Sequence, residues 1–237
     1  MKAVIVAAGT GSRMQQDKKP KTLMQFGNET ILSTIIKNIS TAGIRDFVIV
    51  TGYEAAQIHD YATELKKKLD VTISFAQNNE WTRGNGISVL TAAPLTGSGS
   101  FILSMSDHVV STAAIERMVQ CTSESNLLLV DPRINDVFDI DDATKVLVEN
   151  SSIREIGKEI TTYNAIDCGI FRLTDRFFDS MRNALTYGRE SISAAITGLI
   201  KQNDMEAVFM QSDEYWSDID TPAAYDDALK NFTKTAG

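Results

Sequence analysis

The sequence predicts an α/β fold in which helices flank a Rossmann-like, mainly parallel sheet that carries a small β insertion. Short apolar runs alternate with longer segments of helical periodicity through the first half of the chain, and this alternation is typical of βαβ units. A glycine-containing loop directly follows the first apolar run. The chain has 237 residues and shows neither an internal repeat nor a linker rich in Pro, Gly or Ser, so we expect a single domain over residues 1–237.

Strands are expected where a short run of apolar and β-branched residues is bounded by polar or turn-forming residues. The segment 131–142 is acidic and irregular, and we therefore expect the insertion to occupy about 131–165. The predicted strands are 3–7, 47–51, 72–76, 101–104, 127–130, 144–148, 164–171 and 207–210.

Helices are expected where apolar residues recur three and four positions apart. Two such patterns fall in the first half, one formed by Ile31, Ile35, Ile36 and Ile39 and one formed by Ile58, Ala62 and Leu65. Later helices are predicted at 177–184, 192–200 and 223–232. Thr30 and Asn85 are of the types that cap helices that follow.

Composition and charge narrow the class of protein. The 31 acidic residues outnumber the 23 basic ones, for a net charge of -8, which argues against a nucleic-acid-binding surface. Cys121 and Cys168 are too few for a disulfide framework or a cysteine metal site, which favours reduced thiols and a cytoplasmic protein. The apolar run at 3–8 is too short for a secretory signal. Because no stretch approaches the ~18 apolar residues of a membrane span, we expect no membrane insertion.

The strongest local motif is the segment 7–13, Ala-Ala-Gly-Thr-Gly-Ser-Arg, which a Lys-Lys-Pro-Lys sequence follows at 18–21. Glycines let backbone N–H groups approach a phosphate, and Arg13 and Lys21 can donate charge-assisted hydrogen bonds to its oxygens. The loop lacks the Gly-Lys-Ser/Thr ending of a P-loop, and Met14 stands where a dinucleotide fingerprint needs its third glycine. A Gly-x-Gly alone can be a mere tight turn, but the cations behind it favour a triphosphate site.

Two further segments place carboxylates near predicted strand ends. Asp107 follows the apolar run 101–104, and ligands of open parallel sheets bind beyond the carboxyl ends of strands. Asp218 and Asp220 alternate on an extended segment, so both face the same side. These carboxylates suit Mg²⁺, which prefers a few carboxylate oxygens together with phosphates and water. The alternative is structural, since an Asp after a strand also forms turns, and Asp220 lies close before Pro222, where a helix is expected to start.

The two histidines are open to a plainer interpretation. His108 follows Asp107 directly, and a packing or hydrogen-bonding role is at least as compatible with its position as catalysis. His59 lies in a polar helical segment and is expected to be solvated.

Taken together, these motifs resemble those of the sugar-phosphate nucleotidyltransferases, which begin with Ala-Ala-Gly-x-Gly-x-Arg followed by Pro-Lys and carry an Asp at the end of a later strand. Within that family the sequence is most similar to the CTP:inositol-1-phosphate cytidylyltransferases. The first motif marks the superfamily, whereas the middle segments bear on the subgroup. The likeness covers nearly the whole chain and includes the segments 84–88, 105–108, 143–146, 163–167 and 218–222.

The resemblance implies roles for individual residues. Lys21 and Arg13 would be the catalytic cations, with Lys21 at the reacting α-phosphate. Asp107 and Asp220 would bind Mg²⁺, with Asp218 as the alternative to Asp220. The nucleotide would be bound by Ala7, Ala8, Gly9, Gly11, Asn78, Gly84, Asn85 and Gly86. The acceptor would be bound on the side of the insertion by Lys145, Asn164 and Asp167. Lys145 is equally compatible with a solvated charge, and Asp167 with a structural group.

The function that the resemblance implies is transfer of CMP from CTP to inositol 1-phosphate, which gives CDP-inositol and pyrophosphate. Such a reaction needs no general base, because a phosphomonoester with a second pKa near ~6 is already largely deprotonated at neutral pH. A homodimer is compatible with the family, and a separate membrane transferase is expected to use the product. The choice of CTP depends on the resemblance alone.

The residues leave other functions open. The acceptor can instead be phosphocholine or another amino-alcohol phosphate, or a sugar 1-phosphate paired with UTP. A quaternary ammonium group favours an aromatic cage. Aromatic residues are available for one: Trp81, Tyr163, Tyr187, Tyr215 and Trp216. A non-catalytic nucleotide-binding module is least compatible with the joint presence of Lys21 and the aspartates.

Overall fold

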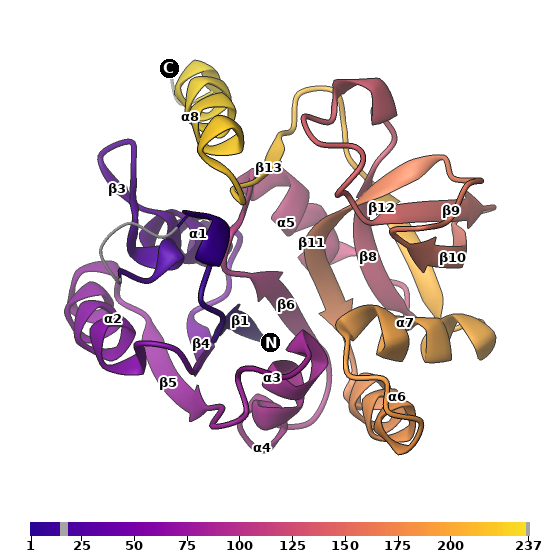
Figure 1. Cartoon of the computed structure of the whole chain (residues 1–237), viewed down its shortest axis with the longest axis horizontal. Coiled ribbons are helices and arrows are strands. Elements are labelled where there is room, and N and C mark those ends of the chain that lie inside the picture. The colour runs from indigo at the N-terminus through magenta and orange to yellow at the C-terminus, as the bar shows by residue number, and fades with distance from the viewer. Residues whose placement is uncertain (15–18, 236–237) are drawn as a thin grey trace.

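The computed structural model describes residues 1–14 and 19–235, and these residues build a three-layer α/β/α arrangement around one large sheet (Figure 1). The order of the nine strands in the sheet is β5-β4-β1-β6-β11-β8-β12-β10-β9. Their bounds are β1 Lys2–Ala7, β4 Asp46–Thr51, β5 Thr72–Gln77, β6 Phe101–Met105, β8 Asn126–Asp131, β9 Lys145–Glu149, β10 Ser152–Gly157, β11 Ala165–Leu173 and β12 Met205–Phe209.

The sheet is parallel in its first half and mixed in its second. Strand β1 pairs in parallel with β4 and β6, and β4 pairs in parallel with β5. Strand β11 is antiparallel to both β6 and β8, so it joins the N-terminal half of the sheet to the C-terminal half. The predicted insertion is not separate from this sheet, because β9 pairs with β11 and β10 pairs with β12.

Helices cover both faces because alternate residues of each buried strand point to opposite sides. Ala3 and Ile5 of β1 pack with α1, α2 and α5, whereas Val4 and Val6 pack with α3, α6 and α7. The helix bounds are α1 Ile31–Thr41, α2 Ala55–Leu69, α3 Asn85–Thr91, α4 Ala93–Thr96, α5 Thr112–Gln120, α6 Asp175–Thr186, α7 Ile192–Lys201 and α8 Pro222–Thr235.

Short elements complete the chain. Strands β2 (Gln25–Phe26) and β3 (Glu29–Thr30) form a hairpin before α1. Strand β7 (His108–Val110) pairs with β13 (Trp216–Asp218) beside the main sheet. The 3-10 turns are η1 (Ser12–Met14), η2 (Lys21–Leu23) and η3 (Ile134–Asp136). Among the described residues no helix is both long and apolar enough to cross a membrane.

The expected caps had different outcomes. Thr30 caps α1, since its side chain accepts a hydrogen bond from Ser33 N, as predicted. Asn85 is the first residue of α3 rather than its cap, and its Oδ1 instead accepts a hydrogen bond from Ile192 N at the start of α7.

His59 is not simply solvated: its ring packs on Phe75 with centroids 4.0 Å apart, and its Nε2 lies 3.0 Å from Thr51 Oγ1.

Candidate active site

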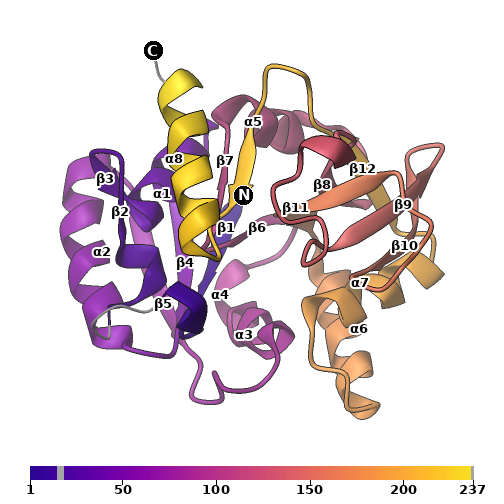
Figure 2. The ribbon, with the colours of Figure 1, turned by 45° about the horizontal axis from the view of Figure 1, so that its top comes forward.

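Two neighbouring cavities open at the carboxyl ends of β1 and β6. The smaller cavity, of about 340 Å³, lies over the loop after β1 and is lined by Gly9, Gly11, Arg13 and Lys21 among others. The larger cavity, of about 530 Å³, lies between the 131–144 segment, β13 and the start of α8. Figure 2 shows the ribbon that carries these segments, with α8 in yellow. The two cavities share a wall that is formed by Asn85, Met105, Asp107 and Asp220.

The glycine loop is shaped to bring Lys21 under the smaller cavity. Gly11 has a φ of +59°, in the left-handed region that favours glycine. A Cβ at this position would lie only 2.6 Å from Cβ of Lys21. The loop closes through a hydrogen bond from Met14 N to Gly11 O at 2.9 Å. Glycine is therefore required here by backbone conformation and also by the close approach of Lys21.

Lys21 lies between two of the predicted metal-binding carboxylates. Its side chain is only 10% exposed, and Nζ donates to Asp107 Oδ2 at 2.6 Å and also to Asp220 Oδ1. Burial favours the neutral amine, but the two carboxylates outweigh burial and raise the pKa of Lys21 above its ordinary value. The side chain is thus a fixed ammonium group at the shared wall of the two cavities.

Arg13 occupies a more exposed position at the rim. Its guanidinium donates to Asp220 Oδ2 and, over 2.8 Å, to Asp142 Oδ2. Asp142 also accepts a hydrogen bond from Lys158 Nζ at 2.6 Å. One carboxylate of the 131–144 segment therefore bridges a cation of the smaller cavity and a cation of the larger one.

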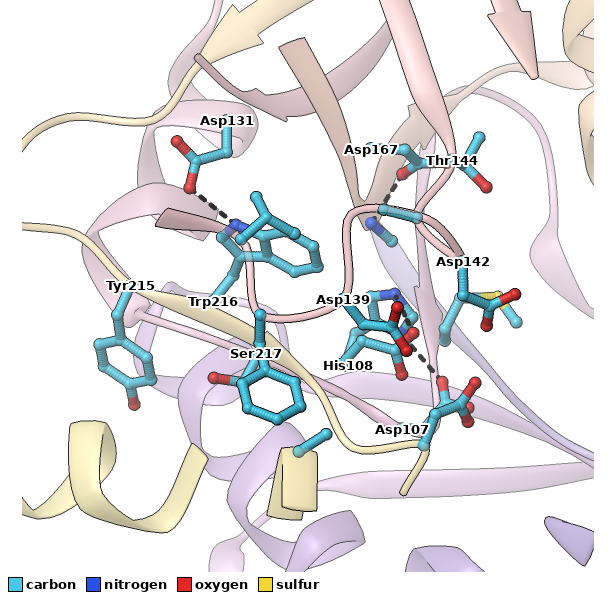
Figure 3. A pocket seen from close by; sticks show the side chains of 18 of the residues that line it. Asp107, His108, Asp131, Asp139, Asp142, Thr144, Asp167, Tyr215, Trp216 and Ser217 are labelled. Carbon is cyan, nitrogen blue, oxygen red and sulfur yellow. Dashed lines mark hydrogen bonds and ion pairs between the residues drawn. The ribbon is translucent and has the colours of Figure 1, made fainter. Parts of the chain in front are cut away.

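His108 contacts Asp107 at the floor of the site (Figure 3) and lies near one further carboxylate, Asp218. Its Nδ1 lies 2.9 Å from Asp107 Oδ1, and its Nε2 lies 3.8 Å from Asp218 Oδ2. Burial disfavours the imidazolium, but Asp218 and Asp107 raise the pKa of His108 to about 9. Burial also opposes ionisation of Asp107, yet His108 and Lys21 hold the pKa of Asp107 below its ordinary range. The site is therefore a tightly coupled set of opposite charges.

The donor set fits a divalent cation. Asp107, His108 and Asp218 each offer one ligand atom, and these atoms lie within 4.8 Å of one another. Oδ1 of Asp218 is buried and has no hydrogen-bond partner within the described part of the chain. Burial raises the pKa of Asp218 to about 6. An orphaned carboxylate oxygen beside a second carboxylate is the environment that a bound cation would satisfy.

The larger cavity has a wall rich in carboxylates. Trp216 Nε1 donates to Asp131 Oδ2 at 2.8 Å, and Arg133 forms an ion pair with the same carboxylate at 2.8 Å. Phe138 is 56% exposed at the mouth of the cavity. Further carboxylates of the lining are Asp136, Asp139, Asp142, Asp167 and Asp227. Lys158 and Arg133 both line the larger cavity, and the sequence analysis predicted neither of these cations.

The structure brings half of the residues predicted to bind the nucleotide, together with the two predicted catalytic cations, to the smaller cavity. Ala7, Gly9, Gly11, Arg13, Lys21 and Asn85 all line it. Ala8 and Asn78 are buried instead: the carbonyl of Ala8 accepts from Tyr53 N, and the amide of Asn78 donates to Ser88 Oγ. Ser88 lines the cavity in their place.

Gly84 and Gly86 pack against the segment before α7 and do not line either cavity. A Cβ on Gly84 would lie 2.4 Å from the carbonyl oxygen of Glu190. A Cβ on Gly86 would lie 2.5 Å from Met181 Sδ. These glycines are explained by close packing, and through it they position Asn85 between them.

Of the three predicted acceptor residues only Asp167 lines the larger cavity. Lys145 Nζ donates to the backbone oxygen of Lys158 at 2.9 Å and lies over the Tyr163 ring. Asn164 forms two hydrogen bonds with the backbone of Val148. The hydrogen bonds of Asn164 join β9 to the start of β11. Lys145 and Asn164 therefore belong to the framework behind the cavity and not to its lining.

A mixed α/β sheet with a glycine loop and two adjoining cavities at the carboxyl ends of its strands is compatible with a nucleotidyltransferase, and comparison with known proteins shows that class. Residues 3–214 match the MobA-like NTP transferase domain, and the chain belongs to that family. It is 32% identical over 235 residues to the bifunctional IPC transferase and DIPP synthase of Thermococcus kodakarensis, which covers 99% of this chain and 51% of that protein. The corresponding protein of Aquifex aeolicus is 29% identical over 236 residues, covering 99% of this chain and 52% of the relative.

Solved structures agree on the fold. The inositol-1-phosphate CTP transferase from T. maritima superimposes with a TM-score of 0.86 at 23% identity, covering 98% of this chain and 96% of that one. A UDP-glucose pyrophosphorylase complexed with UDP-glucose gives a TM-score of 0.82 at 16% identity, with 98% of both chains covered. Nearly the whole of this chain matches these curated relatives, but it spans only about half of their length.

Proposed function

We propose that the chain transfers CMP from CTP to inositol 1-phosphate and releases pyrophosphate, with CDP-inositol as the product. The observation that carries this proposal is the shared wall of the two cavities. Asp107 and Asp220 line both of them, and Lys21 contacts both carboxylates. A nucleotide in the smaller cavity and an acceptor in the larger one would meet at these three side chains, which is the arrangement that in-line attack requires.

The residues of the smaller cavity are suited to a triphosphate. The Gly9 to Gly11 loop presents backbone at the end of β1, and Arg13 and Lys21 supply two cations. In the free protein these cations are paired with Asp220, Asp107 and Asp142. Phosphate oxygens would replace the carboxylates as their partners, and charge that develops at the α-phosphate would be neutralised by groups already in place.

Asp107 and Asp220 are the residues that we propose to hold Mg²⁺, with Asp218 as the adjacent third carboxylate. Asp107 and Asp220 contact Lys21 and form part of the shared wall, and Asp218 lies near His108 in the larger cavity. Bound Mg²⁺ would neutralise phosphate charge and orient the triphosphate. The attacking phosphate oxygen is already ionised at neutral pH, so the chain needs no general base and its residues act by alignment.

The larger cavity favours a polyol acceptor. Carboxylates such as Asp136, Asp139 and Asp167 accept hydrogen bonds, which the hydroxyls of inositol can donate. Lys158 is the cation of this wall that would bind the acceptor phosphate once Asp142 releases it. The 23%-identical structure named an inositol-1-phosphate CTP transferase and the relatives named IPC transferase support the same choice.

A quaternary ammonium acceptor is less well supported. Trp216 lines the larger cavity, but its ring is stacked on His108 with centroids 5.9 Å apart, and its indole N–H is bonded to Asp131. Tyr215 and Phe138 also line this cavity, whereas Tyr163 and Tyr187 are not among the described residues that line it. An aromatic cage would need free ring faces on several sides of the cation.

We also propose a compartment for the reaction, a consumer for its product and an oligomeric state for the protein. Cys121 and Cys168 are free thiols, which supports a reducing compartment such as the cytoplasm. The relatives are named as bifunctional and are about twice as long as the matched region, and a membrane transferase that uses the product is part of this proposal. A homodimer remains part of this proposal, and its test is the mass of the protein in solution.

The test of the function is pyrophosphate release with Mg²⁺ across a matrix of nucleotides and acceptors. CTP, UTP, GTP and ATP would each be combined with inositol 1-phosphate, phosphocholine and glucose 1-phosphate. We expect release with CTP and inositol 1-phosphate, and mass spectrometry should identify CDP-inositol. Release with another pair would retain the mechanism and reject the acceptor or the base, whereas release with none would reject the proposal.

A further inference from the structure

His108 is held more firmly than a neighbour that merely fills space. It begins β7 and lies directly opposite Asp218 of β13 in the two-stranded ladder. Its ring stacks on Trp216 at an interplanar angle of 16°. On another side it meets Gly169, where an added Cβ would lie 2.4 Å from Cδ2 of the imidazole. The strand pairing, the stacking on Trp216 and the space over Gly169 together hold the imidazole ring in one orientation.

The niche under His108 depends on an irregularity of β11. The pairing of β11 with β8 shifts register between Asp167 and Phe171, and Gly169 within this interval has a φ of +73°. The turn is stabilised by a hydrogen bond from Gly169 N to Asp167 Oδ1 at 2.7 Å. Bulges of this kind re-aim side chains beside functional sites. This one makes room for the imidazole.

In that orientation of His108, the two carboxylate oxygens of Asp107 have different partners. Nδ1 lies 2.9 Å from Oδ1, while Oδ2 accepts from Lys21 Nζ at 2.6 Å. The rotation of the carboxylate is thereby fixed. With its other nitrogen, Nε2, the ring lies 3.8 Å from Asp218 Oδ2. One imidazole thus sets the separation between the carboxylate at the end of β6 and the carboxylate at the end of β13.

We propose that His108 is a positioning residue, which orients Asp107 and spaces it from Asp218 so that the carboxylates bind a divalent cation in one geometry. This inference rests on the proposed function in that the cation is the one that the nucleotide transfer uses. Mg²⁺ demands near-octahedral geometry and tolerates little movement of its ligands. Partners that orient metal ligands are commonly worth ~10–100-fold in metal affinity or activity.

Two substitutions separate this role from simple packing. His108→Leu keeps an apolar side chain of similar volume against Trp216 but removes the donor to Asp107. His108→Asn loses the ring but places an amide N–H near the position of Nδ1. A packing role predicts that Leu is the better replacement, whereas a positioning role predicts that Asn is. His59→Asn is the matched control, because His59 contacts Thr51 and Phe75 and lines neither cavity.

The first readout is Mn²⁺ binding to the protein alone, measured from the loss of the free Mn²⁺ signal in electron paramagnetic resonance. We expect His108→Leu to weaken binding ~10-fold or more, and we expect His108→Asn and the control to stay within about threefold of the wild type. The second readout is the Mg²⁺ concentration for half-maximal pyrophosphate release, which should shift in the same order. Thermal melts establish that each variant is folded. If His108→Leu does not fold, the comparison of His108→Asn with the wild type still tests the inference.

The inference is overturned if His108→Leu binds Mn²⁺ as the wild type does, if Asn is no better than Leu, or if the wild type binds none. Failure of the proposed function looks different. In that case CTP and inositol 1-phosphate yield no pyrophosphate with the wild type, while the order of Mn²⁺ affinities among the variants still stands or falls separately.

Discussion

The ammonium group of Lys21 lies 2.6 Å from Oδ2 of Asp107, although the two residues come from the glycine loop after β1 and from the end of β6. These strands are parallel neighbours, so their carboxyl ends reach the same edge of the sheet and bring the two side chains together. Asp107 lies in the wall that both cavities share, and Lys21 lines the smaller cavity beside it. Each group holds the other in its charged form.

Replacing Lys21 by Ala should lower the rate of pyrophosphate release by roughly 10²–10³, because one preorganised cation at the reacting phosphate is lost. Circular dichroism should show an unchanged fold, since the loop backbone does not depend on the ammonium group. Lys19→Ala is the control, as Lys19 is exposed two residues away. A Lys21→Ala enzyme within threefold of the wild type would remove Lys21 from the mechanism.

Asp142→Asn should lower the KM for CTP by a few fold and leave kcat nearly unchanged. In the free protein the Asp142 carboxylate bridges Arg13 and Lys158, and incoming phosphates must displace it. The effect should be modest because these side chains are about half exposed and exposed ion pairs contribute little.

Steady-state kinetics at several CTP concentrations measure this effect. Glu149→Gln serves as the comparison, because it breaks an exposed ion pair with Arg154 outside the lining of both cavities. An unchanged or higher KM in Asp142→Asn would show that Asp142 does not compete with the nucleotide.

Gly86→Ala should destabilise the protein by about 1–3 kcal/mol, the usual cost of overpacking. The added Cβ would lie 2.5 Å from Met181 Sδ and 2.7 Å from the carbonyl oxygen of Glu190. Gly157→Ala is the matched variant, since its nearest contact would be 3.6 Å from Ile160 Cγ2. Urea denaturation measures both, and equal midpoints would contradict the packing explanation for Gly86.

Asp167 should make stability depend on pH. Burial raises the pKa of its carboxyl from 3.8 to about 6, so between about pH 4 and pH 6 the folded chain binds more protons here than the unfolded chain. The contribution of Asp167 to the free energy of unfolding therefore falls as pH rises through this window and levels off above it. Asp167→Asn cannot titrate and retains an acceptor for Gly169 N.

We expect the difference in unfolding free energy between Asp167→Asn and the wild type to grow in favour of Asn from pH 4 to pH 6. Urea denaturation in the presence of a metal chelator measures it across this range. Parallel curves for the two proteins would mean that Asp167 ionises in the folded state at its ordinary pKa.

Several elements escaped prediction for identifiable reasons. Helix α5 has only nine residues and buries Ala114, Ile115 and Met118, which is too short an apolar stripe to establish a period. Strands β7 and β13 have three residues each and are defined only by pairing with each other. Strand β10 carries a register shift between Ile153 and Glu155, which breaks the alternation that marks a strand. Lys158 was missed with it, because it directly follows that strand.

The sequence by itself determined the α/β class, the glycine loop, and the positions of Asp107, Asp218 and Asp220 near strand ends, because apolar runs and turn residues are local properties of the chain. Only the tertiary structure decided which side chains share a cavity. Lys145 points to the framework while Lys158 lines the acceptor side, and His108 links Asp107 to Asp218. Those outcomes depend on strand register and on the bulge in β11, which pairing between distant segments sets and no local pattern encodes.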